Sequence, residues 1–588
     1  MERSAVAHVD VARRLHARGL AANESGQPLR AARLLIRALD LVGHADGGEI
    51  PDDERTVATQ ILITLANSEF ELYGFDRAMI RLATAAAAGL TSLQVSIHNQ
   101  RGLFLLRVGR PIEALREFDE AATWFTDAPV GERCRVLLNR GAVHLERGVL
   151  GSARTDLTQC AELARAAGLA PLAFKALHNL GYLEFLRGDL PLALRLIDDA
   201  NRLDVDVSRG ILLLDQARVL VEAGLARAAD RTLADATAIF RRDRLAQDLA
   251  EAELERARCA LISGDSTAAR RLAGRARERF RRRGNERWRR SAELFLIQAD
   301  LAAGRPAARL VEPALRLRSE LKVEGLRLPS RAAGLIAAQA YLSLGDVHAA
   351  AAAAASVGPA SRDDPITARL HTRHVQAQLD AARGELRSSA TQVRSGLTEL
   401  ARYQASFGSI DLQTAAAIHG RRLAEFGLSI ALHSRRAAGV FAAAEQARAV
   451  STRLPVVRPP EDSETAALLA ELRQTVELLR ALTQERAASA PLLRRRRDLE
   501  RAITARGWTL AGGGGVRPPA RLSEVRAGAA SADAVMVVFV QALGTMHAVV
   551  AGAGRLRLHE LGSAAAITEQ VRRSIAYGRV ARSGSRSF

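Results

Sequence analysis

The fold of this chain is decided by one stretch, HNLGYLEFLRGDLPLALRLIDDA at residues 178–200. Its apolar residues keep a helical period on both sides of Gly188, which predicts two helices joined by a short turn. Gly188 can adopt the left-handed conformation that ends the first helix. The small residues Gly181 and Ala193 let the two backbones approach, and Ile197 fills the gap between them. Such a pair cannot bury its apolar face alone and must stack on similar neighbours.

The same turn glycine recurs along most of the chain. It is found at Gly26, Gly74, Gly109, Gly148, Gly188, Gly224, Gly264, Gly304, Gly345 and Gly384. From Gly109 onward the successive steps are 39, 40, 36, 40, 40, 41 and 39 residues. An Ala five residues later and a small residue seven residues earlier accompany most of these glycines. The period therefore predicts an array of stacked helix pairs.

The repeating unit resembles the tetratricopeptide (TPR) repeat. Residues 178–200 carry the family's Leu-Gly pair, turn glycine and alanines at its spacing, and NQRGLFLLRVGRPIEALREFDEA at 99–121 matches nearly as well. The period is longer than the family's usual length of about 34 residues, which predicts longer linkers or helices. The resemblance covers roughly residues 10–450. It implies a mostly α fold, a TPR-like superhelix (solenoid), whose concave groove receives a protein or peptide.

Polar residues recur in the first helix of three units. Asn99, Asn139 and Asn179 are spaced by 40 residues, and such an amide can bond the backbone of an extended peptide. Arg135 and Lys175, one turn earlier, can hold a carboxylate. These five residues are the candidate peptide-binding groove. The alternative is that the Asn residues tie neighbouring helices together.

The array ends near Pro455, and two further segments follow. Helical stripes over 462–480 and around 493–503 predict an antiparallel helical hairpin, and AGGGG at 511–515 predicts a flexible joint. Beyond the joint the period becomes 2, which predicts strands near 535–540, 546–550 and 555–559 before a helix that begins near Ser563. The expected domains are thus 1–455 (repeat array), 456–515 (hairpin and linker) and 516–588 (a short α/β fragment).

The last segment resembles the opening of a CHAT domain, a caspase-like α/β domain commonly attached to TPR arrays. The resemblance lies in the order of segments in DAVMVVFVQALGTMHAVVAGAGRLRLHELG at 533–562. CHAT proteases resemble caspases in using a His followed by Gly and a Cys nucleophile. No Cys follows Cys259 and no His-Gly pair follows the joint. We therefore expect a truncated domain without catalytic residues, hence no enzyme as given. A longer gene product could still be a cysteine peptidase.

The C-terminal strands also predict a partner. The run Val535–Val540 is continuously apolar, as in a strand buried on both faces. With few further elements to cover it, an open apolar edge would recruit another chain. We therefore expect possible self-association through these strands.

Charge and composition limit the classes of function that the chain can have. Lys and Arg together number 84 against 65 Asp and Glu, and the only lysines, Lys175 and Lys322, follow no Gly-rich turn, which excludes a Walker-type NTPase. The Arg-rich runs 277–290 and 492–497 make a regulator that contacts nucleic acid a second alternative. It is the less favoured partner, because no nucleic-acid-binding fold accompanies the charge.

Neither cofactors nor a metal is expected. The three cysteines are far apart, and His371 and His374, one helical turn apart on a probable helix, lack a recognisable third ligand, so two exposed histidines are the expectation. The charged N-terminus has no apolar core of a signal peptide, and residues 534–554 are too broken by polar residues to span a membrane. We expect a cytoplasmic interaction scaffold or sensor.

Overall fold

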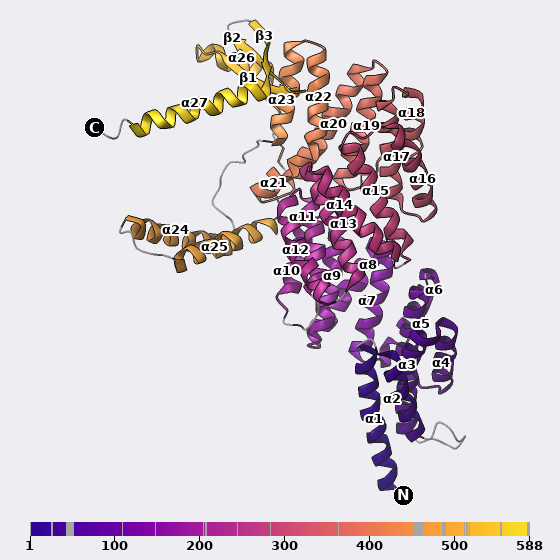
Figure 1. Cartoon of the computed structure of the whole chain (residues 1–588). Coiled ribbons are helices and arrows are strands. Elements are labelled where there is room, and N and C mark those ends of the chain that lie inside the picture. The colour runs from indigo at the N-terminus through magenta and orange to yellow at the C-terminus, as the bar shows by residue number, and fades with distance from the viewer. Residues whose placement is uncertain are drawn as a thin grey trace. The chain divides into compact units, whose positions relative to one another are not determined.

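The computed structural model describes most of the chain (Figure 1). The described residues are 2–24, 27–42, 52–108, 110–147, 149–203, 205, 209–243, 245–282, 284–362, 364–451, 462–484, 490–510, 512, 515–516, 518–552 and 555–584. The chain divides into two compact units. Unit 1 comprises residues 1–184 and 195–207, and unit 2 comprises residues 185–194 and 208–588.

Unit 1 is built from helices that pack in consecutive pairs. They are α1 (Glu2–Glu24), α2 (Pro28–Leu41), α3 (Asp52–Tyr73), α4 (Phe75–Ala87), α5 (Thr91–Arg107), α6 (Pro111–Thr123), the 3-10 helix η1 (Phe125–Asp127), α7 (Val130–Glu146) and α8 (Leu150–Ala166). Two more helices, α9 (Ala170–Arg187) and α10 (Leu190–Asn201), contribute residues to both units.

Unit 2 continues the paired arrangement and then leaves it. Its repeat helices are α11 (Arg209–Glu222), α12 (Ala226–Arg242), α13 (Ala246–Ser263), α14 (Ser266–Arg282), α15 (Glu286–Ala302), α16 (Ala308–Val323), α17 (Arg327–Ser343), α18 (Val347–Ala355), α19 (Ile366–Ala382), α20 (Leu386–Ala405), α21 (Ile410–Ala416), the 3-10 helix η2 (Ala417–Gly420), α22 (Arg421–His433) and α23 (Ala437–Ser451). The expected mostly α fold of stacked helix pairs is confirmed.

The turn glycines adopt the predicted conformation. Seven of them have φ between 67° and 89°: Gly74, Gly188, Gly224, Gly264, Gly304, Gly345 and Gly384. Gly26, Gly109 and Gly148 lie outside the described residues. The small residues of the first helices permit the close approach that the pattern predicts. A Cβ on Gly102 would stand 2.5 Å from the ring of Phe118, which is fully buried. Substitution there would force the two helices of the pair apart.

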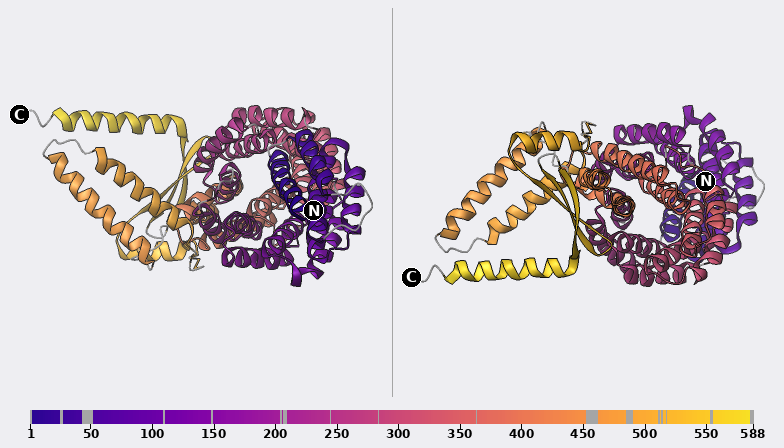
Figure 2. Two further views of the ribbon diagram at one scale, coloured as in Figure 1. Left: turned by 90° about the horizontal axis from the view of Figure 1, so that it is seen from below. Right: turned by 90° about the horizontal axis from the view of Figure 1, so that it is seen from above.

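Within unit 2 the helix array returns to its own beginning. The turn between α11 and α12 touches α21, where a Cβ on Gly224 would stand 2.3 Å from the carbonyl oxygen of Ala415. The magenta helices near residue 220 and the orange helices near residue 415 accordingly lie side by side (Figure 2). Repeats distant in sequence are thus in direct contact.

The predicted helical hairpin is present as α24 (Ser463–Gln484) and α25 (Ala490–Trp508), which pack on each other. Two backbone hydrogen bonds hold the end of α25 beside α20. Gly408 N donates to Leu510 O over 2.9 Å, and Gly512 N donates to Ser406 O over 2.8 Å. The hairpin is therefore fixed to the repeat array at its C-terminal end.

The chain ends in a three-stranded antiparallel sheet of order β1-β2-β3, preceded by α26 (Leu522–Ser531) and followed by α27 (Ala564–Gly584). The strands β1 (Met536–Ala542), β2 (Thr545–Gly552) and β3 (Arg555–Ser563) confirm the three predicted strands. One face of the sheet packs on α22 and α23, where Val538, Val540 and Val549 meet Phe441.

The expectation that β1 is buried on both faces is wrong. Val538 and Val540 are buried, but the alternate residues Val537 and Phe539 keep 44% and 64% of their surface exposed. Because successive side chains of a strand point to opposite faces, the helices beneath the sheet cover only one set. The described residues place no helix over the other set. Among these residues, also, no helix combines the length and apolarity that crossing a bilayer requires.

Candidate peptide-binding surfaces

The predicted groove residues lie on the first helices of consecutive pairs in unit 1. Asn139 on α7 donates its side-chain N–H to the Oδ1 of Asn99 on α5 over 2.9 Å. Asn99 is buried, Asn139 is partly buried, and Asn179 on α9 is partly buried. The structure thus joins the first two of the three asparagines.

The two predicted cations of this groove remain at the surface. Arg135 is exposed and pairs with Glu132 on its own helix. Lys175 is exposed on α9. Each stands one turn before an asparagine, and positions four apart share a helix face. Both cations are thus accessible to solvent on successive first helices.

Polar contacts between first helices occur in other repeats as well. In unit 1, Ser68 on α3 donates to Asn23 on α1 over 2.8 Å. In unit 2, Gln339 on α17 is the donor to Gln378 on α19 over 3.0 Å. These pairs tie successive helices together, as the alternative interpretation of the asparagines requires. A ligand contact by Asn99 would have to compete with an existing hydrogen bond.

A buried polar junction connects distant repeats of unit 2. Glu222, at the end of α11, accepts hydrogen bonds at its carboxylate from Arg258 on α13 and, over 3.1 Å, from Thr367 on α19. Its backbone carbonyl accepts from the Tyr403 hydroxyl over 3.1 Å and from His419 Nε2 over 2.7 Å. One residue therefore receives bonds from four helical elements.

The charges of this junction are matched. Burial would raise the pKa of the Glu222 carboxyl, but the charges of Arg258 and His419 and the hydrogen bonds leave that pKa below its ordinary value. Burial raises the pKa of Tyr403 well above 10 and lowers the pKa of His419. Glu222 is thus an ionised carboxylate, and both of its carboxylate oxygens and its backbone carbonyl accept hydrogen bonds. Since its partners are all internal, its role is structural.

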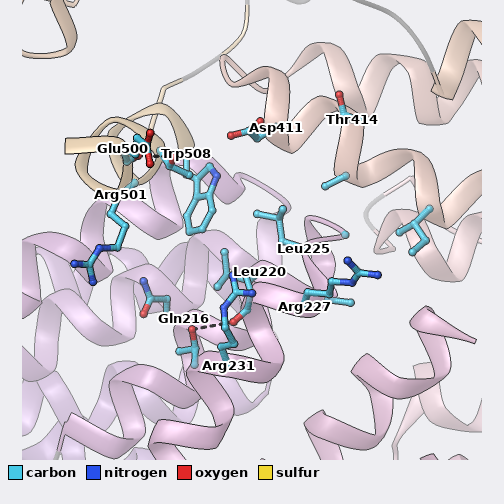
Figure 3. Close-up of a pocket in the computed structure, with 18 of the residues that line it drawn as sticks. Gln216, Leu220, Leu225, Arg227, Arg231, Asp411, Thr414, Glu500, Arg501 and Trp508 are labelled. Atoms are coloured by element: carbon cyan, nitrogen blue, oxygen red, sulfur yellow. Dashed lines mark hydrogen bonds between the residues drawn. The ribbon is translucent and has the colours of Figure 1, made fainter. Parts of the chain in front are cut away.

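A large cavity opens beside this junction, between α11 and α12, α21 with η2, and α25 (Figure 3). Its volume is about 1690 Å³. The α12 wall supplies Arg227 and Arg231, and the α25 wall supplies Arg501 and Trp508. Leu220, Leu225 and Ile418 form apolar parts of the lining. We call this space the arginine cavity.

Several arginines of the arginine cavity form no ion pair with any described carboxylate. Six arginines line it: Arg227, Arg231, Arg421, Arg494, Arg497 and Arg501. Arg501 pairs with Asp498, and Arg497 donates to a backbone carbonyl of its own helix. Within the described part of the chain, Arg227, Arg231, Arg421 and Arg494 have no ion-pair partner. Asp235 and Asp411 also line the cavity without an ion pair there.

The Arg-rich run 277–290 has a different character. Arg279 pairs with Glu253, Arg281 with Glu278 and Arg290 with Glu320. The ring of Trp288 stacks on that of Phe280 at 5.6 Å, inside the apolar core of these helices. Arg279 and Arg290 thus pair between helices, Arg281 pairs within its own helix, and the partly buried Trp288 packs against the core.

The histidines and cysteines are held inside the repeats. His371 donates to Gln339 over 3.2 Å, and His374 contacts the ring of Phe426 edge-on. Burial, together with neighbouring positive charge, lowers the pKa of both rings to about 4. The expectation of two exposed histidines is therefore wrong, because both rings are partly buried between helices. No cluster of three or more potential metal ligands occurs among the described residues.

Sequence reasoning missed the buried junction and most of the arginine cavity. The Arg-rich run 492–497 includes Arg494 and Arg497, but nothing in the sequence pattern places these two residues opposite Arg227 and Arg231. An i, i+4 pair of arginines one turn after a repeat glycine was the available signal. In an Arg-rich chain this spacing is common, so only the fold distinguishes this pair from others.

Compared with protein-family models and with curated proteins, the chain has no match. Solved structures of helical-repeat proteins are similar to it at low identity. The apo form of the quorum sensor NprR from B. thuringiensis is 12% identical with a TM-score of 0.46, covering 59% of this chain and 97% of its own. The STAND protein PH0952 from Pyrococcus horikoshii, with a tetratricopeptide repeat sensor, is 13% identical with a TM-score of 0.37, covering 78% and 69%. Both TM-scores lie below 0.5.

Proposed function

We propose that this chain is an interaction scaffold that binds a protein or an extended peptide along the first helices of unit 1. The observation that carries the proposal is the exposed pair of cations, Arg135 and Lys175, on successive first helices. The Asn99–Asn139 hydrogen bond ties α7, which carries Arg135, to the preceding first helix α5. A rigid surface loses little conformational entropy on binding, so its few charged contacts can contribute to affinity.

The test is selection of peptides from a random display library on the full chain, followed by affinity measurement with variants. Arg135→Glu/Lys175→Glu should lower the affinity for the selected peptides by about tenfold or more, since each charge-assisted hydrogen bond contributes roughly 1.5–3 kcal/mol. The matched control is Arg116→Glu/Arg165→Glu. It makes a similar charge change at exposed positions of the second helices α6 and α8. Equal affinity for both variants would remove the proposed groove.

We further propose that the C-terminal sheet corresponds to the opening of a CHAT domain, so that the repeats act as the sensor of such a protein. The β1-β2-β3 order followed by α27 supports this correspondence. The alternative is a fragment of a caspase-like cysteine peptidase whose catalytic part lies beyond residue 588. Reading the genomic DNA after that codon distinguishes the two, because a His-Gly pair and a later Cys in frame would indicate a peptidase.

The chain as given is proposed not to be a peptidase. All three of its cysteines are buried, and burial raises the pKa of each thiol, to about 12 for Cys160 and Cys259. A cysteine nucleophile reacts as the thiolate, which such an environment disfavours at neutral pH. These observations support a scaffold in preference to an enzyme.

A further inference from the structure

The arginine cavity is more than a gap between helices, because backbone contacts anchor its walls at the C-terminal end of α25 and at the turn before α12. The two backbone bonds from Gly408 and Gly512 hold the end of α25 in place. The contact between Gly224 and Ala415 fixes the opposite walls, α12 and α21. A preformed cavity can bind without the cost of ordering its own walls.

The charge of the cavity favours an anionic ligand, because six arginines line it against the four carboxylates of Asp235, Asp411, Asp498 and Glu500. Four arginines that line it, Arg227, Arg231, Arg421 and Arg494, have no ion pair within the described part of the chain. Arg227 and Arg231 are four residues apart, so both guanidinium groups leave the same face of α12. Guanidinium groups bind carboxylates through paired, charge-assisted hydrogen bonds.

The size and the apolar lining narrow the ligand class. A volume of about 1690 Å³ exceeds the roughly 300–1000 Å³ of small-molecule sites. The wall between the charges is apolar, with Leu220, Leu225 and the indole of Trp508. A peptide that alternates acidic and apolar side chains would satisfy both kinds of lining.

The acidic residues of the cavity argue against nucleic acid. Asp235 and Asp411 lie in the lining without an ion pair among the described residues. A nucleic-acid strand carries a phosphate at every nucleotide and would meet these carboxylates. A peptide can place its carboxylates apart, opposite the arginines alone.

We propose that the arginine cavity is a second binding site, which takes an acidic peptide segment with apolar side chains between its carboxylates. The carboxylates bind Arg227, Arg231, Arg421 and Arg494, and the apolar side chains pack on Leu225 and Trp508. This site extends the scaffold function to unit 2 and is independent of the groove residues of unit 1.

The test uses the full chain and three fluorescein-labelled probes, measured by fluorescence anisotropy. The probes are a ten-residue peptide that alternates Glu and Leu, its counterpart with Gln in place of Glu, and a ten-nucleotide oligothymidylate. The cavity variant is Arg227→Glu/Arg231→Glu. The control is Arg271→Glu/Arg275→Glu, an exposed pair with the same spacing on α14, the second helix of the next repeat. Circular dichroism verifies that both variants remain folded.

We expect the Glu-Leu peptide to bind the wild type and the control alike, and the cavity variant about tenfold or more weakly, from the loss of two charge-assisted contacts. The Gln-Leu peptide should bind weakly to all three proteins. Equal binding of the Glu-Leu peptide to the cavity variant and the control would overturn the proposal, as would no binding to the wild type. If only the oligothymidylate bound the wild type, and bound the cavity variant more weakly, the ligand of the site would be nucleic acid and the proposal of an acidic peptide would be overturned. The same titration with Arg135→Glu/Lys175→Glu distinguishes this site from the unit 1 groove. That variant should bind the Glu-Leu peptide with the affinity of the wild type.

Discussion

Gly224 and Ala415 are in backbone contact although almost two hundred residues lie between them, and only glycine fits at the first position. A Cβ on Gly224 would stand 2.3 Å from the carbonyl oxygen of Ala415, and the φ of Gly224 is +88°. Both the conformation and the space thus exclude a side chain. The contact closes the helix array of unit 2 onto its own first turn.

The first prediction concerns this contact. Gly224→Ala should lower the free energy of unfolding by roughly 2–4 kcal/mol, the sum of left-handed strain and overpacking. Gly264→Ala is the matched control. Its φ is +85°, but the nearest atom to its Cβ would lie 4.0 Å away, so it should cost only about 1 kcal/mol. Urea unfolding monitored by circular dichroism measures both, and equal losses would contradict the close approach.

The second prediction concerns the buried carboxylate. Glu222→Gln removes the nearest anion of Arg258 and leaves it only Glu255, at 4.0 Å. The loss should be roughly 2–4 kcal/mol, less than for a fully buried pair because Arg258 also keeps a quarter of its side-chain surface. Since the pKa of Glu222 lies below its ordinary value of 4.5, its contribution is complete above that pH. This stabilisation is lost as the pH falls through the lower pKa that Glu222 has in the folded chain.

The urea midpoints of the wild type and Glu222→Gln should therefore converge at acid pH. The exposed carboxylate Glu278, which pairs with Arg281 and Arg282, provides the control. Glu278→Gln should lower the free energy of unfolding far less than Glu222→Gln, because solvent screens an exposed ion pair. A loss from Glu222→Gln no larger than this would show that the junction is not stabilising.

The third prediction concerns pH. Because the pKa values of His371 and His374 are about 4 in the folded chain and 6.5 ordinarily, the unfolded chain binds more protons between these values. Stability is complete above pH 6.5 and falls as the pH drops toward 4. Between pH 7 and 5 each histidine should cost roughly 1–2 kcal/mol. The loss of unfolding free energy between pH 7 and pH 5 should be smaller in His371→Gln/His374→Gln than in the wild type. It should be unchanged in His348→Gln, whose ring is exposed.

The fourth prediction concerns the thiols. Cys134, Cys160 and Cys259 are buried, so an aromatic disulfide reagent should label none of them within minutes in the native protein at pH 8, and all three in urea. Replacing the three by Ser should leave any trace peptidase activity unchanged. A peptide cleavage that requires a thiol and disappears in this triple variant would contradict the scaffold assignment.

The fifth prediction concerns the uncovered face of the C-terminal sheet. Val537 and Phe539 expose apolar surface beside the edge of β1 that pairs with no other described strand, and such edges recruit other chains. The full chain should therefore form oligomers in size-exclusion chromatography with light scattering. Val537→Thr/Phe539→Thr should shift it toward the monomer. Leu543→Asn, which removes an exposed apolar side chain from the β1–β2 turn and tolerates the φ of +51° there, should not.

The sequence was sufficient for the repeat unit because its determinants are local. The glycine that ends a helix, the small residue at the close approach and the aromatic ring that fills it all lie within about 40 residues, as Gly102 and Phe118 illustrate. The three strands were predictable for the same reason, since each has its own period. The domain boundaries and the groove residues of unit 1 stay predictions.

The junction and the arginine cavity were beyond such reasoning. Glu222 and His419 meet only because many small rotations between successive pairs add up, and no local pattern encodes that sum. The same holds for Arg227 and Trp508, which belong to a repeat helix and to the hairpin. Exposure of Phe539 likewise depends on which elements cover the sheet, whereas the run of apolar residues indicates only a strand.

The contact of Glu222 with Tyr403 and His419 changes how this part of the molecule should respond to force and heat. An open repeat array behaves as a one-dimensional stack, in which terminal repeats fray first. Because α11 is tied to η2, hydrogen bonds hold both ends of the intervening stretch of repeats. This stretch cannot lengthen or fray stepwise from one end until those bonds have broken. Repeats between α11 and η2 should then lose their structure together, with slow amide hydrogen exchange shared across all of them.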